Sequence, residues 1–316
     1  FNSYAEVPTW SHFDIEKGRT AWANVANAIS NFEQVKMIVH PNNIVNASKL
    51  LNEKVETLSF VNDDAWARDS GAIFLLNKEK KLGGVDWEFN GWGKFSPYDS
   101  DNKIAKFMIE NANATYFKND MILEGGSIHT DGDGTLLTTE QCLLNKNRNP
   151  DLSKEQIEEN LKDYLGVNKI IWLKNGTDEG TDGHVDNIAC FVAPGKILAL
   201  SCSNKQDTFY DQINENLEIL KTSVDSKGRV LEIIELEMSY KRLIPNDDEP
   251  SSYINFYIAN KGIVMPSFDD EKADKNAKNI IQETFPDRKI VAINGIDISM
   301  GGGNVHCITQ QQPLSI

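Results

Sequence analysis

The sequence predicts an α/β protein built from five quasi-repeats that close around one shared axis. A unit of helix, strand, polar motif and hairpin occurs repeatedly along the 316 residues. Corresponding turns are about 55 to 65 residues apart, a spacing that suits one supersecondary unit per repeat. Such units cannot each bury their own apolar face, so they pack on one another. No Pro/Gly/Ser-rich linker divides the chain, and we expect one domain over residues 1–316.

Helices are expected where apolar residues follow helical spacing. The first is the clearest, because Trp22, Val25 and Ile29 share one face. Another begins at Ser153, with Gln156 three residues later as a capping signal. The predicted helices cover residues 15–31, 41–51, 102–111, a segment from 153, 206–222 and 271–284.

Strands are expected in the apolar, β-branched runs between these helices. One repeat is split across the chain termini, and its last strand is expected over residues 305–309, after three consecutive glycines. The other single strands cover residues 35–39, 55–61, 169–173, 230–236 and 289–293. Hairpins turn at residues 77–81, 131–134, 194–195 and 260–262.

Composition bounds the partners and the compartment. The net charge of −15 argues against nucleic acid or an anionic membrane as partner and favours cationic ligands. No apolar run is long enough to span a membrane. The four cysteines form no CxxC pair, and no charged-then-apolar leader opens the sequence. We therefore expect a reduced, cytoplasmic protein without disulfides or structural zinc.

The polar motifs enter their hairpins at equivalent places, so they should converge at one end of the shared axis. The chemically useful residues collected there are Asp69, Glu124, His184, Asp186 and Cys307, with Trp66 and Trp92 nearby. Each has a structural alternative. Cys307 could be a buried thiol, Asp69 and Arg68 a surface ion pair, Glu124 a turn cap, and His184 with Asp186 a hydrogen-bonded pair on a strand.

Cys307 is the expected nucleophile. In the predicted strand its side chain points with Val305 and away from His306, so its partners should be His184 and Asp186. Neighbouring carboxylates disfavour a thiolate, so this thiol should be protonated in the free protein at neutral pH. His12, His40 and His129 have no such neighbours and are expected to be structural.

The three acids at this site would repel one another unless a cation lay among them. A planar guanidinium fits, because carboxylates can accept paired N–H bonds from it and hold its central carbon near a sulfur nucleophile. Aromatic faces of Trp66 and Trp92 would also suit a cation. A metal is the rival interpretation, but no HxxxH or HExxH spacing is present, and no metal is expected.

Five motifs resemble those of the agmatine deiminases, in the guanidino-group-modifying superfamily. They are WARD at residues 66–69, EGGSIH at 124–129, TLLTTEQCLLNKNRNP at 135–150, TDGHVDN at 181–187 and GGGNVHCITQQQP at 301–313. The resemblance implies a five-fold αββαβ propeller, no metal or organic cofactor, and hydrolysis of agmatine to N-carbamoylputrescine and ammonia.

The resemblance also implies a role for each motif residue. Cys307 would attack the guanidinium carbon and His184 would move protons. Asp69 and Asp186 would bind guanidinium nitrogens, and Glu124 would orient the histidine and the substrate.

The ammonium tail of agmatine should be attracted by the nearby acids Asp63, Asp178, Glu179 and Asp182. No arginine or lysine except Arg68 is expected among the motif loops to pair with a carboxylate. Two other classes stay open: a peptidyl-arginine or free-arginine deiminase, and a binder of guanidines without turnover. A homodimer is possible.

Overall fold

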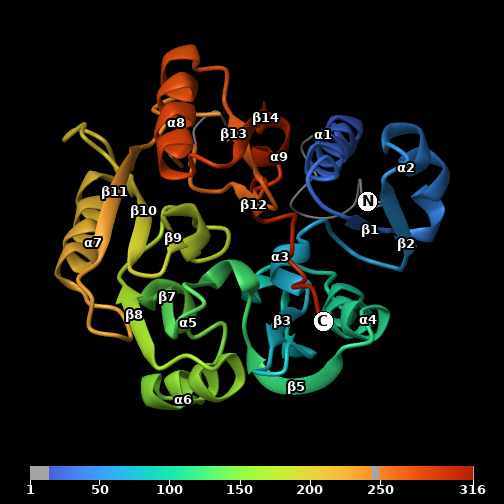
Figure 1. Cartoon of the computed structure of the whole chain (residues 1–316), viewed down its shortest axis with the longest axis horizontal. Coiled ribbons are helices and arrows are strands. Elements are labelled where there is room, and N and C mark those ends of the chain that lie inside the picture. Colours follow the sequence, from blue (N-terminus) through green and yellow to red (C-terminus); the bar gives the residue numbers. More distant parts are fainter. Residues whose placement is uncertain (1–13, 244–248, 316) are drawn as a thin grey trace.

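Five small β-sheets surround a central axis in the computed structural model, which describes residues 14–243 and 249–315 (Figure 1). Four of these sheets have three strands and one has two. The chain passes from sheet to sheet in sequence order, and most of the connecting helices lie on the outside of the ring. The expected five-fold α/β propeller is therefore confirmed.

Each three-stranded sheet has the same topology. A hairpin supplies two antiparallel strands, and a crossover helix leads to a third strand parallel to the hairpin's second strand. The sheets contain β3 (Ile73–Leu76), β4 (Leu82–Glu88) and β5 (Thr115–Ile122); β6 (Ile128–Thr130), β7 (Thr135–Thr139) and β8 (Lys169–Leu173); β9 (Ala189–Ala193), β10 (Lys196–Ser201) and β11 (Glu232–Glu237); β12 (Tyr257–Ala259), β13 (Gly262–Ser267) and β14 (Lys289–Asn294).

The crossover helices bury one face against the sheets. In α6, Ile157 and Leu161 are buried, and the helix begins after Ser153 with the predicted capping box to Gln156. Gly166 ends it with a φ of 67°, a conformation that glycine adopts without strain. The crossover helices of the three-stranded sheets are α4 (Ile104–Asn111), α6 (Lys154–Leu165), α7 (Tyr210–Thr222) and α8 (Glu271–Thr284).

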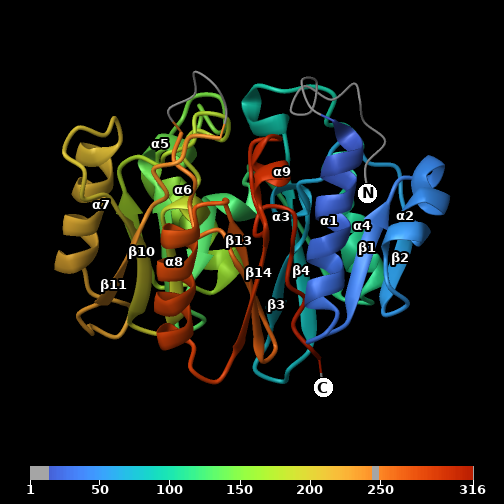
Figure 2. The same cartoon turned by 90° about the horizontal axis from the view of Figure 1, so that it is seen from above.

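The two-stranded sheet belongs to the repeat that is split across the termini. Its strands β1 (Val35–Val39) and β2 (Val55–Ser59) are parallel and joined by η2 (Pro41–Asn43) and α2 (Ile44–Leu50). They correspond to the second and third strands of the other units. Helix α1 (Ile15–Ile29) precedes them and contacts α9 (Ile296–Ser299), so the first and the last helix of the described chain lie side by side (Figure 2).

The strand predicted over residues 305–309 is wrong. This segment forms turns, and the backbone N–H of Thr309 donates to the carbonyl of His306 at 3.1 Å. The Thr309 hydroxyl also binds the carbonyls of Val305 and His306, at 2.9 and 3.0 Å. These local bonds compete with pairing to a neighbouring strand, so the β-branched residues here do not produce one.

Other predicted bounds agree more closely with the structure. Strands β1 and β8 and helix α8 have the predicted ends. The helix predicted over residues 102–111 begins as a 3-10 turn, η4 (Asp101–Lys103), before α4. The helix predicted from residue 206 begins later, at Tyr210. His12 lies outside the described residues.

Apolar side chains of the strands fill the space between the sheets and their helices. In β4 every residue from Leu82 to Trp87 is buried, and one apolar cluster extends from Leu137 to Ile290. Short helical turns follow some of the strands. After the last strand of a sheet come α3 (Ala67–Ser70), η5 (Gly125–Ser127) and η6 (Val185–Asn187), and after a middle strand come η3 (Gly91–Gly93) and α5 (Glu140–Leu143). Packed sheets thus hold these turns in place. Among the described helices, none is long and apolar enough to cross a membrane.

Candidate active site

Three motif side chains meet around Gly126. A Cβ atom at this position would lie 2.6 Å from Nδ1 of His184, 2.8 Å from Oδ1 of Asp69 and 3.1 Å from Oδ2 of Asp186. Only a residue without a side chain fits between these groups. The structure therefore brings together residues from three motifs that lie far apart in the sequence.

Asp69 lies in α3 and is buried. Its Oδ1 accepts the backbone N–H of Gly126 at 2.9 Å, and its Oδ2 accepts the indole N–H of Trp92 at 2.9 Å. Burial raises the pKa of Asp69 to about 6, although the nearby His184 opposes the shift. The carboxylate is thus oriented by two donors before any ligand binds.

Arg68 holds the segment that carries Cys307. Its backbone N–H donates to the carbonyl of Cys307 at 3.1 Å. Its guanidinium donates from Nη1 to Oε1 of Gln310 at 2.5 Å and to Oε1 of Gln311 at 2.7 Å. Arg68 and Asp69 are both buried, so they are not the surface ion pair offered as the structural alternative.

Asp186, in η6, faces two neighbours in the C-terminal segment. Its Oδ2 lies 2.8 Å from Nδ1 of His306 and 3.5 Å from Sγ of Cys307. Burial and the charge of Arg68 lower the pKa of His306 well below its usual value, so this ring is neutral and donates its Nδ1–H to Asp186.

The prediction that Cys307 points away from His306 is therefore wrong. It assumed strand alternation, and the turns over residues 305–309 direct both side chains toward Asp186. The alternative that placed His184 and Asp186 on one strand also fails, because these residues lie at the start of η6.

Cys307 is buried, with only 7 % of its surface exposed. Its Sγ lies 3.2 Å from the side-chain nitrogen of Asn255. Burial raises the thiol pKa well above its usual value, and the carboxylates of Asp186 and Asp69 add to this shift. The thiol is therefore protonated at neutral pH in the ligand-free protein, as the crowding of acids predicted.

His184 lies between two carboxylates. Its Nδ1 is 3.7 Å from Oδ1 of Asp69, and its Nε2 is 3.9 Å from Oε2 of Glu124. Burial alone would lower the pKa of His184, but Asp69, Cys142 and Glu124 outweigh this and raise it well above the usual value. The ring is therefore an imidazolium at neutral pH and can act as an acid.

Glu124 is completely buried and bound by Arg148, whose side chain is also buried. Nε of Arg148 donates to Oε1 of Glu124 at 2.6 Å. Burial would raise the pKa of Glu124, but the Arg148 guanidinium and His184 outweigh it and hold the pKa below its usual range. Glu124 therefore stays ionised beside the imidazolium.

Two cations besides Arg68, Arg148 and Lys94, lie at the motif loops, and both are bound by Asp182. Arg148 donates from Nη1 to Oδ2 of Asp182 at 2.8 Å, and Nζ of Lys94 lies 2.6 Å from Oδ1 of the same residue. Pattern reading missed both contacts because the cations lie 34 and 88 residues from Asp182. Asp182 is thus compensated by two cations.

The other acids expected to attract the substrate tail are also engaged or exposed. Asp63 accepts the backbone N–H groups of Ser100 and Asp101, at 2.7 and 3.3 Å. Asp178 is buried and accepts the N–H of Gly180 at 2.7 Å. The Glu179 side chain is exposed, and its carbonyl accepts a bond from Lys94. Asp63 and Asp178 are thus each held by backbone groups of the protein.

Both tryptophans border the motif loops. A Cβ atom at Gly303 would lie 2.5 Å from the Trp66 ring and 3.1 Å from Cβ of Cys307, so this glycine lets the indole approach the cysteine. Trp92 has a φ of 56° and donates to Asp69. This bond shows that Trp92 positions the Asp69 carboxylate.

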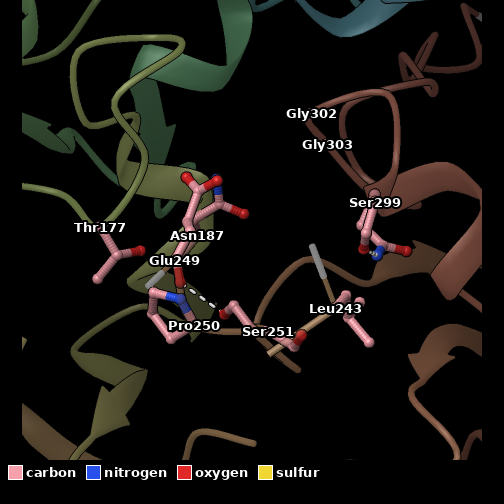
Figure 3. A pocket seen from close by; sticks show the side chains of 11 residues that line it. Thr177, Asn187, Leu243, Glu249, Pro250, Ser251, Ser299, Gly302 and Gly303 are labelled. Carbon is pink, nitrogen blue, oxygen red and sulfur yellow. Dashed lines mark hydrogen bonds between the residues drawn. The ribbon is translucent and has the colours of Figure 1, made fainter. Parts of the chain in front are cut away.

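A cavity of about 60 Å³ lies beside the Cys307 segment (Figure 3). Gly302, Gly303 and Ser299 border it on one side, and Asn187, Thr177 and Glu249 on the other. Glu249 is the one acidic residue among the described residues that line it, and none of those residues is Arg or Lys. This opening is therefore polar and more suited to a cation than to a carboxylate.

Glu124, Cys142 and His184 offer ligand atoms within 4.8 Å of one another, which is close enough to consider a metal ion. The chemistry of these three residues does not favour a metal ion. Arg148 already neutralises Glu124, and His184 would have to lose a proton that its neighbours stabilise. These residues suit proton transfer better than metal binding.

Sequence reasoning missed three polar residues that contact the predicted site: Arg148, Asn255 and His306. Arg148 lies within the motif at residues 135–150, but its partners Glu124 and Asp182 are remote in sequence. Asn255 follows a Ser-Ser-Tyr-Ile run before β12 that carries no chemical pattern. His306 was set aside because the segment was interpreted as a strand.

The chain matches the Porphyromonas-type peptidyl-arginine deiminase family over residues 3–313. A Legionella pneumophila (strain Paris) protein, whose name assigns it provisionally to the agmatine deiminases, is 46% identical over 310 residues and covers 97% of this chain and 90% of its own. The agmatine deiminase of Pseudomonas aeruginosa (strain UCBPP-PA14) is 42% identical, with coverages of 93% and 87%.

A solved structure agrees with these sequence comparisons. The agmatine deiminase of Enterococcus faecalis superposes with a TM-score of 0.89 at 38% identity, and the match covers 93% of this chain and 87% of that one. The sequence and the fold therefore agree over nearly the whole chain. The protein belongs to the Porphyromonas-type peptidyl-arginine deiminase family, together with the agmatine deiminases that it resembles.

Proposed function

We propose that this protein hydrolyses agmatine to N-carbamoylputrescine and ammonia. One observation carries the proposal: Glu124 Oε2, Asp186 Oδ1 and both ring nitrogens of His184 are buried and form no hydrogen bond with any residue of the described ranges. Two of these atoms are carboxylate oxygens, acceptors that match the N–H groups of a planar guanidinium. The relatives named agmatine deiminases support agmatine as the source of that group.

The arrangement would place the guanidinium next to the nucleophile. Asp186 lies 3.5 Å from Sγ of Cys307, so a cation bound to this carboxylate adjoins the sulfur. The same cation neutralises Asp186 and Asp69, the two acids that raise the thiol pKa. Substrate binding therefore helps to release the thiol proton and form the nucleophile.

The chemistry then divides into two halves. The thiolate attacks the central carbon, a C–S bond forms, and a C–N bond breaks as His184 gives its proton to the departing ammonia. Neutral His184 next takes a proton from water as the oxygen adds to the same carbon. The C–S bond breaks, N-carbamoylputrescine leaves, and the thiolate regains a proton. His184 thus acts first as acid and then as base.

Asp69 and Asp186 should be needed for substrate recognition. Replacing either one by asparagine removes a charge-assisted acceptor and should reduce kcat/KM by roughly 2–4 kcal/mol, which is about 30- to 1000-fold. Steady-state ammonia release checks this. Asp120→Asn is a matched control, because that side chain is 94% exposed and should leave kcat/KM unchanged. Wild-type kinetics in either site variant would assign that residue to folding alone.

The alternative deiminases differ in the tail that they must accommodate. A free arginine carries an α-carboxylate, whereas agmatine ends in an ammonium group. Glu249 borders the cavity beside the site, and Lys94 and Arg148 are already paired with Asp182. The acid at the cavity favours the ammonium, and none of the described residues that line the cavity is an Arg or Lys that could bind the carboxylate.

Agmatine should therefore be preferred over arginine by about 100-fold or more in kcat/KM, the order of effect expected when the carboxylate of arginine is placed beside an acid without a cation to bind it. Ammonia release with agmatine, arginine and a blocked arginine peptide measures this preference. Comparable values for arginine would support the free-arginine deiminase, and turnover of the blocked peptide would support the peptidyl enzyme. Binding of agmatine without ammonia release would instead identify a guanidine-binding protein.

A further inference from the structure

We propose that Asn255 is a further catalytic residue, whose side-chain N–H donates to the Cys307 sulfur and stabilises the thiolate. The inference rests on the proposed role of Cys307 as nucleophile. Asn255 is completely buried, in the segment before β12. Its Nδ2 lies 3.2 Å from Sγ, within hydrogen-bond distance for sulfur.

Two other bonds fix the orientation of this amide. The backbone N–H of His306 donates to Oδ1 of Asn255 at 2.9 Å, so the oxygen end faces the backbone. Nδ2 of Asn255 donates to Oδ1 of Asn187 at 2.9 Å. An amide nitrogen carries two N–H groups, so one can bind Asn187 while the other points at the sulfur. The donor is therefore held in place before the thiolate forms.

The charges around Cys307 explain why a neutral donor is useful here. Asp186 on η6 and Asp69 on α3 disfavour the thiolate, while the Arg68 guanidinium attracts it. His306 is neutral, and the His184 imidazolium lies between carboxylates. An amide stabilises negative sulfur without pairing with the carboxylates that must bind the guanidinium. Asn255 thus stabilises the sulfur directly, whereas the substrate neutralises the carboxylates, so the two do not compete for the same group.

Asn255 also connects the sulfur to the cavity beside the site. Asn187, which accepts from Asn255, lines that cavity next to Thr177 and Glu249 (Figure 3). Ser252 holds this wall by donating to the Asn187 carbonyl at 2.6 Å, but no described bond joins it to the sulfur. Ser252 therefore provides a control for the structure of the loop.

Two variants test the Asn255 N–H donor separately from the bond that Asn255 accepts from the His306 backbone. Asn255→Leu removes the donor without adding charge, and Asn255→Asp preserves the shape and the acceptor for His306. The rate of Cys307 alkylation by iodoacetamide, followed against pH by mass spectrometry of the Cys307 peptide, reports the thiol pKa without agmatine turnover. Folding of each variant is checked by circular dichroism.

Both variants should raise the thiol pKa by about one to two units and slow alkylation at fixed pH about 10- to 100-fold, the usual range for a hydrogen bond to a charged group. Ser252→Ala should keep the wild-type pKa. The proposal is overturned if a folded Asn255 variant keeps that pKa, if Ser252→Ala shifts it equally, or if neither Asn255 variant folds. Loss of agmatine turnover with an unchanged thiol pKa would also count against it, whereas a raised pKa in a protein inactive on agmatine would reject only the proposed substrate.

Discussion

Replacing Cys307 by alanine is expected to abolish ammonia release from agmatine while the fold stays intact. Sγ of Cys307 lies 3.5 Å from Oδ2 of Asp186, the carboxylate proposed to bind the guanidinium, and no described hydrogen bond joins another thiol to Asp186. The change removes one sulfur atom at the edge of the site, and we expect the free energy of unfolding to fall by only about 1 kcal/mol. Ammonia release and urea-induced unfolding measure the two effects.

Agmatine should still bind to this variant, because Asp69 and Asp186 keep their donors from Gly126, Trp92 and His306. Isothermal calorimetry can test this without turnover. Cys202→Ala is the matched control, since that sulfur contacts Asn204 and Tyr240 and should be dispensable. Steady-state turnover above background in Cys307→Ala would remove Cys307 from the role of nucleophile.

The repeat architecture could be predicted from the sequence because the helices and strands of each unit have signals in their own residues. Apolar runs such as residues 169–173 are strands wherever they are packed, and the capping box at Ser153 marks a helix start by nearby side chains alone. The segment 305–309 has the same β-branched composition but a different outcome. Its backbone is bound by its own Thr309 and by Arg68 and Asn255, residues that are 238 and 51 positions distant. Tertiary bonds of this kind override local propensity.

The site could be predicted only in part, for a related reason. Asp69, His184 and Asp186 were found because their motifs occupy equivalent places in the repeats, and Gly126 shows that they meet. The tail acids were chosen by proximity in sequence, which cannot show that Asp182 is neutralised by Arg148 and Lys94. Asn255 had no signal at all, because an amide acquires a function only from the sulfur that the fold places beside it.

The Arg148 guanidinium is expected to contribute the largest single amount to the stability of the site. It binds Glu124 at 2.6 Å, Asp182 at 2.8 Å and the carbonyl of Thr181 at 2.9 Å, with its own side chain fully buried. Arg148→Met would leave the carboxylate of Glu124 buried without its cation. Breaking such a pair typically costs about 3–5 kcal/mol, and we expect a loss of that order in the free energy of unfolding at neutral pH.

The stability lost in Arg148→Met should depend on pH, whereas a simple loss of packing would cost the same at every pH. In the wild type the pKa of Glu124 is held below its usual value, so its stabilising contribution is present above the unfolded pKa, about 4.3, and is lost as the pH falls through the folded pKa. In Arg148→Met burial would raise that pKa, and a protonated Glu124 needs no cation. The stability difference between the two proteins should therefore narrow as the pH falls from the raised pKa of Glu124 in the variant toward its lowered pKa in the wild type.

A second substitution tests whether the unpaired charge is the cause. Adding Glu124→Gln to Arg148→Met removes that charge and should restore part of the stability, although not activity, because Glu124 adjoins His184. Arg229→Met is the surface control, since this arginine also pairs with two acids but is 45% exposed and should matter much less. Urea unfolding at pH 7.5 and pH 4.5 provides the measurement. If Arg148→Met were as stable as the wild type, or if its loss were the same at both pH values, the buried pair could not be what holds Glu124 ionised beside His184.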